Sequence, residues 1–114
     1  MRFLGTEIGE TEMNETLMKT EYSKAFDEKR KGLIEQSYYK YGPARKNFGE
    51  GRVDAIKTAE LCLSAFNKDH NLEHLVDAAN YLMFRFKYPL PGDKFEPRDS
   101  DGSVGTVGTP INIE

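Results

Sequence analysis

Two amphipathic segments joined by a very short link constrain the fold of this chain more than any other feature. Residues 51–67 carry apolar side chains at offsets of 0, 3, 7 and 10 from Ile56, which is the spacing of one helical face. Residues 71–88 form a second such segment, which should end before Pro89 because proline disfavours a helical conformation in the residue that precedes it. The link of residues 68–70 is so short that the two helices should pack as antiparallel neighbours.

The second segment, "NLEHLVDAANYLMFRFKYP", has one broad apolar face. We expect this face to pack against the first helix and to form the core. The apolar face comprises Leu72, Leu75, Val76, Ala79, Leu82, Met83 and Phe86. The residues expected to be buried in the hairpin are Ile56, Leu63, Phe66, Leu75, Ala79 and Met83.

A third helix is expected over residues 20–40, where Tyr22, Phe26, Leu33 and Ile34 roughly share a face and Gly32 weakens the pattern. The Gly-Pro pair at 42–43 and the glycines that follow it should break the chain. The predicted fold is therefore mainly α, a small helical bundle built on an antiparallel helical hairpin, with this helix packed across it.

The chain divides into three zones. Residues 1–20 read as a polar acidic arm, with a short ordered piece allowed around Phe3–Ile8, and residues 21–89 read as the helical domain. Residues 90–114 are rich in proline and glycine and predict an irregular tail, although Val104–Ile113 could pair at a sheet edge.

A polar row runs along the second helix of the hairpin. Glu73, Asp77, Asn80 and Phe84 fall at offsets of 0, 4, 7 and 11, on a different side from the apolar face. The row can be a solvated stripe, an interaction face with Phe84 as its anchor, or part of a divalent-metal site. We expect an outward contact surface in which Phe84 is the anchor.

The stretch "SYYKYGPARKNFGEGR" interleaves aromatic and cationic side chains, a combination that can stack bases and hold phosphates. The alternative is that the rings pack at the helix end while the cations face solvent. Candidate phosphate or nucleic-acid contacts are Tyr39, Lys40, Tyr41, Arg45, Lys46 and Arg52.

Composition narrows the classes of function. The net charge of −3 argues against a protein dedicated to binding duplex nucleic acid. No apolar run approaches the roughly 20 residues of a membrane helix, and the N-terminal residues do not resemble a secretory signal. Cys62 is the only cysteine, which excludes an intramolecular disulfide and favours the cytoplasm; we expect it to be a buried structural thiol.

Residues 43–105 resemble a group of small, uncharacterised bacteriophage and prophage proteins. The resemblance is carried by "KNFGEGRVDAIKTAELCLSAF", "NLEHLVDAANYLMFRFKYP" and "FEPRDSDGSVG". It implies a mobile-element origin and the cytoplasm of a bacterial host, but no reaction.

A second resemblance is to the MazG-like all-α nucleotide pyrophosphohydrolases, whose helical hairpin holds Mg²⁺ with an ExxE pair and an ExxD pair. "EHLVDAANYL" looks like the second half of that site, although Glu73 and Asp77 are four residues apart instead of three. The preceding helix offers only Asp54 and Glu60, six apart, in place of the first pair.

The expected function is that of a small phage-encoded accessory protein that binds a host or phage macromolecule. Inhibition of bacterial defence, as by an anti-CRISPR, is one specific form of this activity. We expect a protein partner, leave a homodimer open, and expect no membrane, catalytic residue, resident metal or cofactor. The alternative is a Mg²⁺-dependent MazG-like pyrophosphohydrolase.

Overall fold

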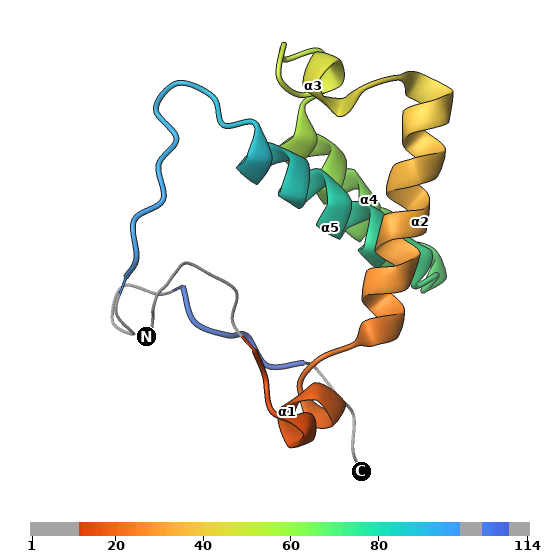
Figure 1. The fold of residues 1–114 in the computed structure, drawn as a ribbon, viewed down its shortest axis with the longest axis vertical. Helices are drawn as coiled ribbons and strands as arrows, with labels where there is room; N and C mark the ends of the chain where they lie inside the picture. Colours follow the sequence, from red (N-terminus) through yellow and green to blue (C-terminus); the bar gives the residue numbers. More distant parts are fainter. Residues whose placement is uncertain (1–11, 99–103, 110–114) are drawn as a thin grey trace.

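The computed structural model describes residues 12–98 and 104–109, and within them the secondary structure is entirely helical. The helices are α1 (Glu15–Thr20), α2 (Lys24–Tyr41), α3 (Ala44–Asn47), α4 (Ala55–Asp69) and α5 (Glu73–Lys87) (Figure 1). The prediction of a small, mainly helical bundle is confirmed.

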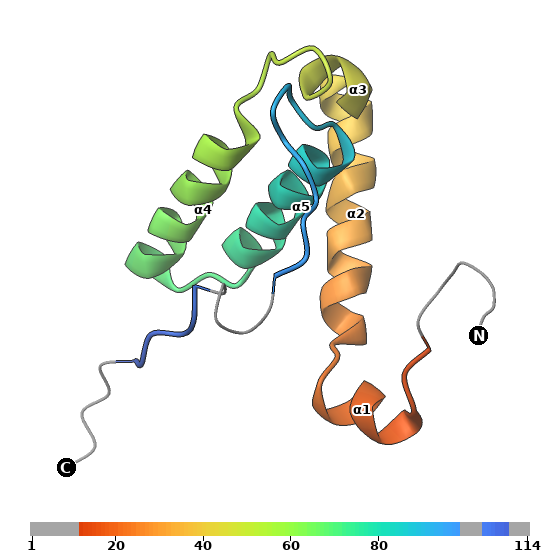
Figure 2. The ribbon, with the colours of Figure 1, turned by 90° about the vertical axis from the view of Figure 1, so that its left-hand side faces the viewer.

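Helices α4 and α5 form the predicted antiparallel hairpin (Figure 2). The Asp54 side chain caps the start of α4 by accepting a hydrogen bond from the Lys57 N–H at 3.0 Å. His70 ends α4 in the left-handed conformation, with φ of 58°. The Asn71 side chain then accepts a hydrogen bond from the Glu73 N–H at 3.0 Å, so the three-residue link is held by its own polar groups.

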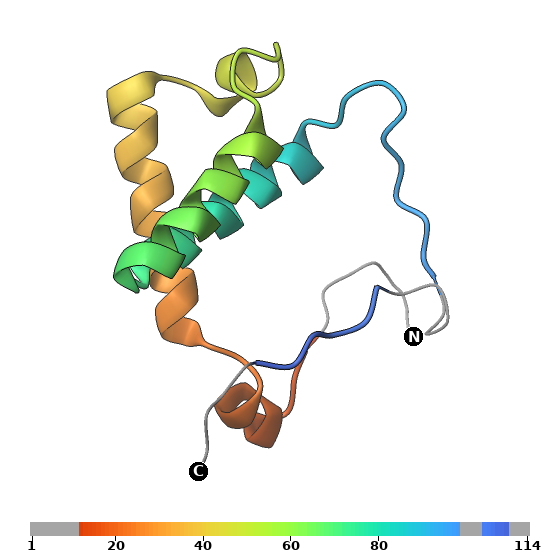
Figure 3. The ribbon, with the colours of Figure 1, turned by 180° about the vertical axis from the view of Figure 1, so that it is seen from behind.

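Helix α2 packs across α5, as predicted (Figures 1 and 3). The Ser23 hydroxyl caps its first turn by accepting from the Phe26 N–H at 3.0 Å. Gly42 ends it with φ of 87°, a conformation that residues with a side chain rarely adopt. The helix therefore begins four residues later than expected from the sequence and ends one residue later.

The predicted break after α2 contains a short helix, α3, that the sequence analysis did not anticipate. A Cβ atom at Gly49 would collide with the backbone oxygen of Arg45, which explains why glycine stands where the chain leaves this turn. The turn places the Phe48 ring against α5, where it stacks on Phe84 with a centroid distance of 4.5 Å.

The structure describes only part of the N-terminal arm and of the C-terminal tail. The polar acidic arm contains a short helix, α1, whose first turn Asn14 caps by accepting from the Leu17 N–H at 2.9 Å. The piece expected around Phe3–Ile8 lies outside the described residues. Residues 90–98 and 104–109 contain no helix or strand, and residues 110–113 of the proposed edge strand are not described.

The predicted core is partly wrong. Ile56 and Leu63 are exposed, at 38% and 47% of their surface, and so are Leu72, just before α5, and Leu82 and Phe86 on α5. Phe66, Leu75, Ala79 and Met83 are half-buried. In the part of the chain that the structure describes, the buried apolar residues are small: Ala55, Ala59, Val76 and Ala78.

The physical reason lies in where the neighbours of α5 sit. Small side chains allow two helices to approach closely, and the hairpin buries alanines at such positions. Helix α2 covers the side of α5 that carries Asn80. On the apolar face of α5, Val76 is thus buried, whereas Leu82 and Phe86, on the side away from Asn80, stay exposed.

Candidate functional site: an aromatic pocket and an apolar hairpin face

The polar row of α5 does not form the outward surface that we expected. Asn80 is buried at 6% exposure, and Phe84 is half-buried beneath the Phe48 ring. Asp77 is half-buried and Glu73 alone is exposed. The row therefore faces the interior between α2, α3 and α5 along most of its length, and that part of the prediction is wrong. A binding role for these residues stays a prediction.

Asn80 is buried, with hydrogen bonds that join both its amide nitrogen and its amide oxygen to Arg30 of α2. Its Nδ2 donates to the backbone oxygen of Arg30 at 3.1 Å, and its Oδ1 accepts from Arg30 Nη1 at 3.4 Å. The same guanidinium reaches Asp27 at 3.4 Å and the Met83 sulfur at 3.2 Å. A buried amide without such partners would be strongly unfavourable, so this network explains a polar residue at a buried position.

Asp77 has a different environment from Asn80. Among the described residues no donor hydrogen-bonds its carboxylate. Burial raises the pKa of Asp77 above its usual value of 3.8, the negative charge of Glu73 raises it further, and His74 lowers it in part. The folded protein therefore destabilises the anionic form of Asp77 relative to the protonated form.

Asp77 opens onto a pocket of about 290 Å³ between α2, α3 and α5. Aromatic rings from both segments singled out in the sequence meet there. Tyr38 and Tyr41 come from α2, Phe48 follows α3, and Tyr81 and Phe84 come from α5. Part of the polar row and part of the aromatic stretch thus line one pocket.

The aromatic wall is continuous. Phe48 stacks on Phe84 with an interplanar angle of 18°, and its centroid lies 6.0 Å from that of Tyr81. Burial raises the pKa of the Tyr81 phenol, and the nearby Cys62 and Asp77 add to this effect. Tyr38 and Tyr41 are exposed, so they form the rim of the pocket while the other three rings form its wall.

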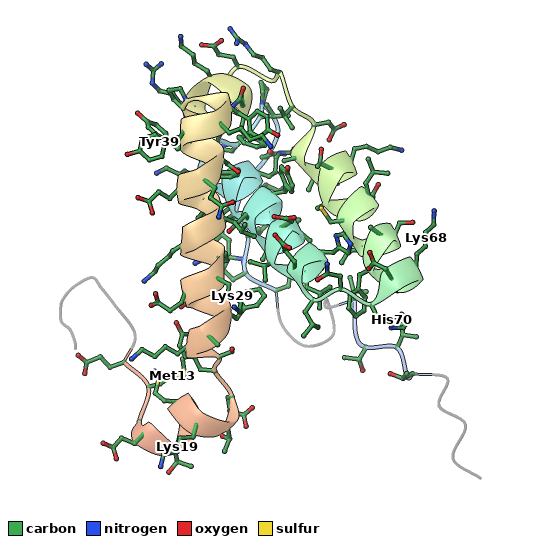
Figure 4. The ribbon with its side chains drawn as sticks, turned by 90° about the vertical axis from the view of Figure 1, so that its right-hand side faces the viewer. Met13, Lys19, Lys29, Tyr39, Lys68 and His70 are labelled. Carbon is green, nitrogen blue, oxygen red and sulfur yellow. The ribbon has the colours of Figure 1, made fainter. Side chains whose placement is uncertain are left out.

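The cationic candidates do not enter the pocket. Lys40, Arg45, Lys46 and Arg52 are exposed, and Arg52 pairs with Glu50 at 3.3 Å. Tyr39 is 79% exposed and points away from the hairpin (Figure 4). Tyr41 alone of the six predicted contacts lines the pocket. A phosphate or nucleic-acid role for this set stays a prediction.

A second feature is the apolar hairpin face, which we define as Ile56 and Leu63 of α4 with Leu82 and Phe86 of α5. Ile56 and Leu63 lie two turns apart on one side of α4, and Leu82 and Phe86 lie one turn apart on α5. Ile56 of α4 and Phe86 of α5 line one hollow together with Phe95, so the exposed apolar side chains of the two helices meet there. Phe95 extends the apolar hairpin face from the tail by an edge contact with Phe86 at 6.3 Å.

The two histidines contact side chains of α4. His74 Nε2 lies 2.9 Å from Asp69 Oδ2 across the hairpin turn, and the His70 ring lies beside Phe66. Cys62 is half-buried, and burial raises the pKa of its thiol. Within the described ranges no group of three or more His, Cys, Asp or Glu side chains could hold a metal ion, so the carboxylate cluster implied by the MazG resemblance is not found there.

Sequence reasoning missed Tyr81 and misassigned Phe86. Tyr81 follows Asp77 by four residues and so lies one turn along the same side of α5, which was a usable signal. Phe86 was expected in the core, because periodicity identifies an apolar side but not what covers it.

None of the helices in the described residues combines the length and the apolar character needed to cross a bilayer. Comparison of the chain with protein-family models, with curated proteins and with solved structures finds no match.

Proposed function

We propose that this protein acts by binding another protein through the apolar hairpin face. The observation that carries the proposal is the exposure of large apolar side chains on two adjacent helices: Phe86 is 70% exposed and Leu82 is 50% exposed. Single exposed apolar residues are ordinary on protein surfaces, but a joined patch on two helices is typical of an interaction site.

The weak core supports the same proposal. Among the described residues, the buried positions hold alanine, valine and one asparagine, while leucine and phenylalanine side chains remain in contact with water. Covering a phenylalanine side chain contributes roughly 1.5–3 kcal/mol, so a partner that covers Phe86 and Leu82 gains a substantial part of its affinity from them.

Charged groups beside the apolar hairpin face suit a specific contact. The Arg85 guanidinium binds the Asp93 carboxylate through two hydrogen bonds, at 3.0 and 2.9 Å, next to Phe86. Asp93 also accepts from the Leu90 N–H at 2.9 Å, which fixes the start of the tail beside the face. A polar edge around apolar anchors is the usual composition of a protein interface.

Within this proposal, the chain is a small accessory protein of bacteriophage origin that works in the cytoplasm of a bacterial host. Its partner is a host or phage protein, and blocking a component of bacterial immunity, as an anti-CRISPR does, is the specific form we propose. The origin rests on the resemblance of residues 43–105 to small phage proteins.

Quantitative capture from bacterial lysate tests the proposal. Wild-type protein should capture a defined protein that mass spectrometry identifies, and Phe86→Ser should lose it. Tyr39→Ser is the matched control, because Tyr39 is an aromatic residue at least as exposed on a different helix. Equal capture by wild type and Phe86→Ser would overturn the proposal, and so would a wild-type dimer that Phe86→Ser converts to monomer without any partner captured.

A further inference from the structure

The aromatic pocket has a chemical character distinct from that of the apolar hairpin face. Five aromatic rings and one carboxylate line it: Tyr38, Tyr41, Phe48, Tyr81, Phe84 and Asp77. No Lys, Arg or His of the described residues lines the pocket. Asp77 is thus its single strongly charged group.

We propose that this pocket binds an organic cation, an ammonium or guanidinium group, between the aromatic rings and the carboxylate of Asp77. Cations are attracted to the faces of aromatic rings, and this attraction strengthens where water is excluded. A carboxylate adds charge-assisted hydrogen bonds to the same ligand. The site is independent of the protein-binding role proposed for the apolar hairpin face.

The state of Asp77 supports this chemistry. Its carboxylate is half-buried without a hydrogen-bond donor from the described residues. Burial makes the largest contribution to its raised pKa; Glu73 on α5 raises the pKa further and His74 on α5 lowers it in part. Asp77 also lies close enough to Cys62 on α4 and Tyr81 on α5 to raise their pKa values. A bound cation would supply the missing partner and lower the pKa again.

The size of the pocket limits the ligand. A volume of about 290 Å³ lies just below the usual range for ligand pockets, roughly 300–1,000 Å³. It suits a small free amine or guanidine, or one basic side chain of a peptide. Lys40 does not fill this role, because its ammonium lies over the outer Tyr41 ring at 5.2 Å and its side chain is not part of the lining.

Titration followed by ¹⁵N–¹H NMR tests the proposal with charged ligands and their neutral isosteres. One arm uses N-propylguanidinium against N-propylurea, and the other uses acetyl-Gly-Arg-Gly-amide against the same peptide with citrulline. The charged ligand should give saturable shifts at residues around the pocket, and the neutral isostere should bind at least about tenfold more weakly. Tighter binding in the peptide arm would assign the cation to a partner's side chain, and binding confined to the small ligand would assign it to a free metabolite.

Asp77→Asn is the decisive variant, since it removes the charge and keeps the shape. It should weaken binding of the charged ligand by about tenfold or more, while Glu28→Gln, which neutralises an exposed carboxylate of α2 outside the pocket lining, should leave it unchanged. A thermal melt confirms that Asp77→Asn is folded. Equal binding of charged and neutral ligands, absence of saturable shifts, or full binding by folded Asp77→Asn would each overturn the proposal.

Discussion

Asn80 and Arg30 are joined by two hydrogen bonds across the contact of α5 with α2. The Asn80 amide donates to the Arg30 backbone oxygen at 3.1 Å and accepts from the Arg30 guanidinium at 3.4 Å. Because this pair holds α2 against the polar row, Leu82 and Phe86 on the opposite side of α5 stay exposed. The orientation of α5 is therefore set by a polar contact between residues 50 positions apart.

Replacing Asn80 with Ala should lower the free energy of unfolding by about 1–3 kcal/mol. The substitution removes both hydrogen bonds and leaves the half-buried Arg30 guanidinium with fewer partners. Chemical denaturation measures the change. Asn67→Ala, at an exposed position on α4, is the control and should stay within about 0.5 kcal/mol of wild type.

Truncation to alanine should destabilise the fold at Phe84 but leave its stability almost unchanged at Phe86, although the two residues are only two positions apart. Phe84→Ala removes a ring stacked on Phe48 and should destabilise the fold by about 2–3 kcal/mol, less than a fully buried phenylalanine would. Phe86→Ala should change stability by less than about 0.5 kcal/mol, because the ring is largely in water. Thermal melts that rank the two variants the other way would show that α5 is turned differently.

The pH dependence of stability should report on Asp77. Its pKa is raised in the folded state, so the folded protein favours the protonated form and loses stability as the pH rises from 3.8 through the folded pKa. Asp77→Asn should therefore be more stable than wild type at pH 7, with the difference shrinking towards pH 4. Asp69 and Asp93 have lowered pKa values and act in the opposite direction in both proteins, so the difference between the two proteins isolates Asp77. A difference that does not vary with pH would contradict the assignment.

Gly32 stands in the middle of α2 with open space where a Cβ would lie. Gly32→Ala should stabilise the protein by about 0.5–1 kcal/mol, since alanine has the higher helix propensity. Gly42→Ala is the paired substitution, and it should destabilise by about 1–2 kcal/mol because Gly42 has φ of 87°. Denaturant midpoints for the two variants should move in opposite directions from that of wild type.

The hairpin could be predicted from sequence because its signals are local. The helical spacing after Ile56, the short link, and the proline at 89 together define α4 and α5 to within a few residues of their observed bounds. Helix α3 has only four residues, too few to show a period, and α1 offered its capping Asn14 but no apolar periodicity.

Which side of each helix packs against a neighbouring helix could not be predicted from such local signals. Asn80 has its partner on Arg30, far away in sequence, and nothing near Asn80 in the chain indicates that contact. Periodicity placed Leu82 and Phe86 on the apolar side of α5 correctly, but whether a neighbouring helix covers that side depends on how α2 crosses the hairpin. The pocket likewise needed α2, α3 and α5 brought together before Tyr41 and Tyr81 could meet.

The affinity of Phe86→Ala for the captured partner tests the central claim most directly. Isothermal titration with the purified partner should show binding about ten- to a hundredfold weaker than that of wild type, the equivalent of roughly 1.5–3 kcal/mol, with an unchanged melting temperature. A dissociation constant equal to that of wild type would contradict the assignment of the apolar hairpin face as the binding surface.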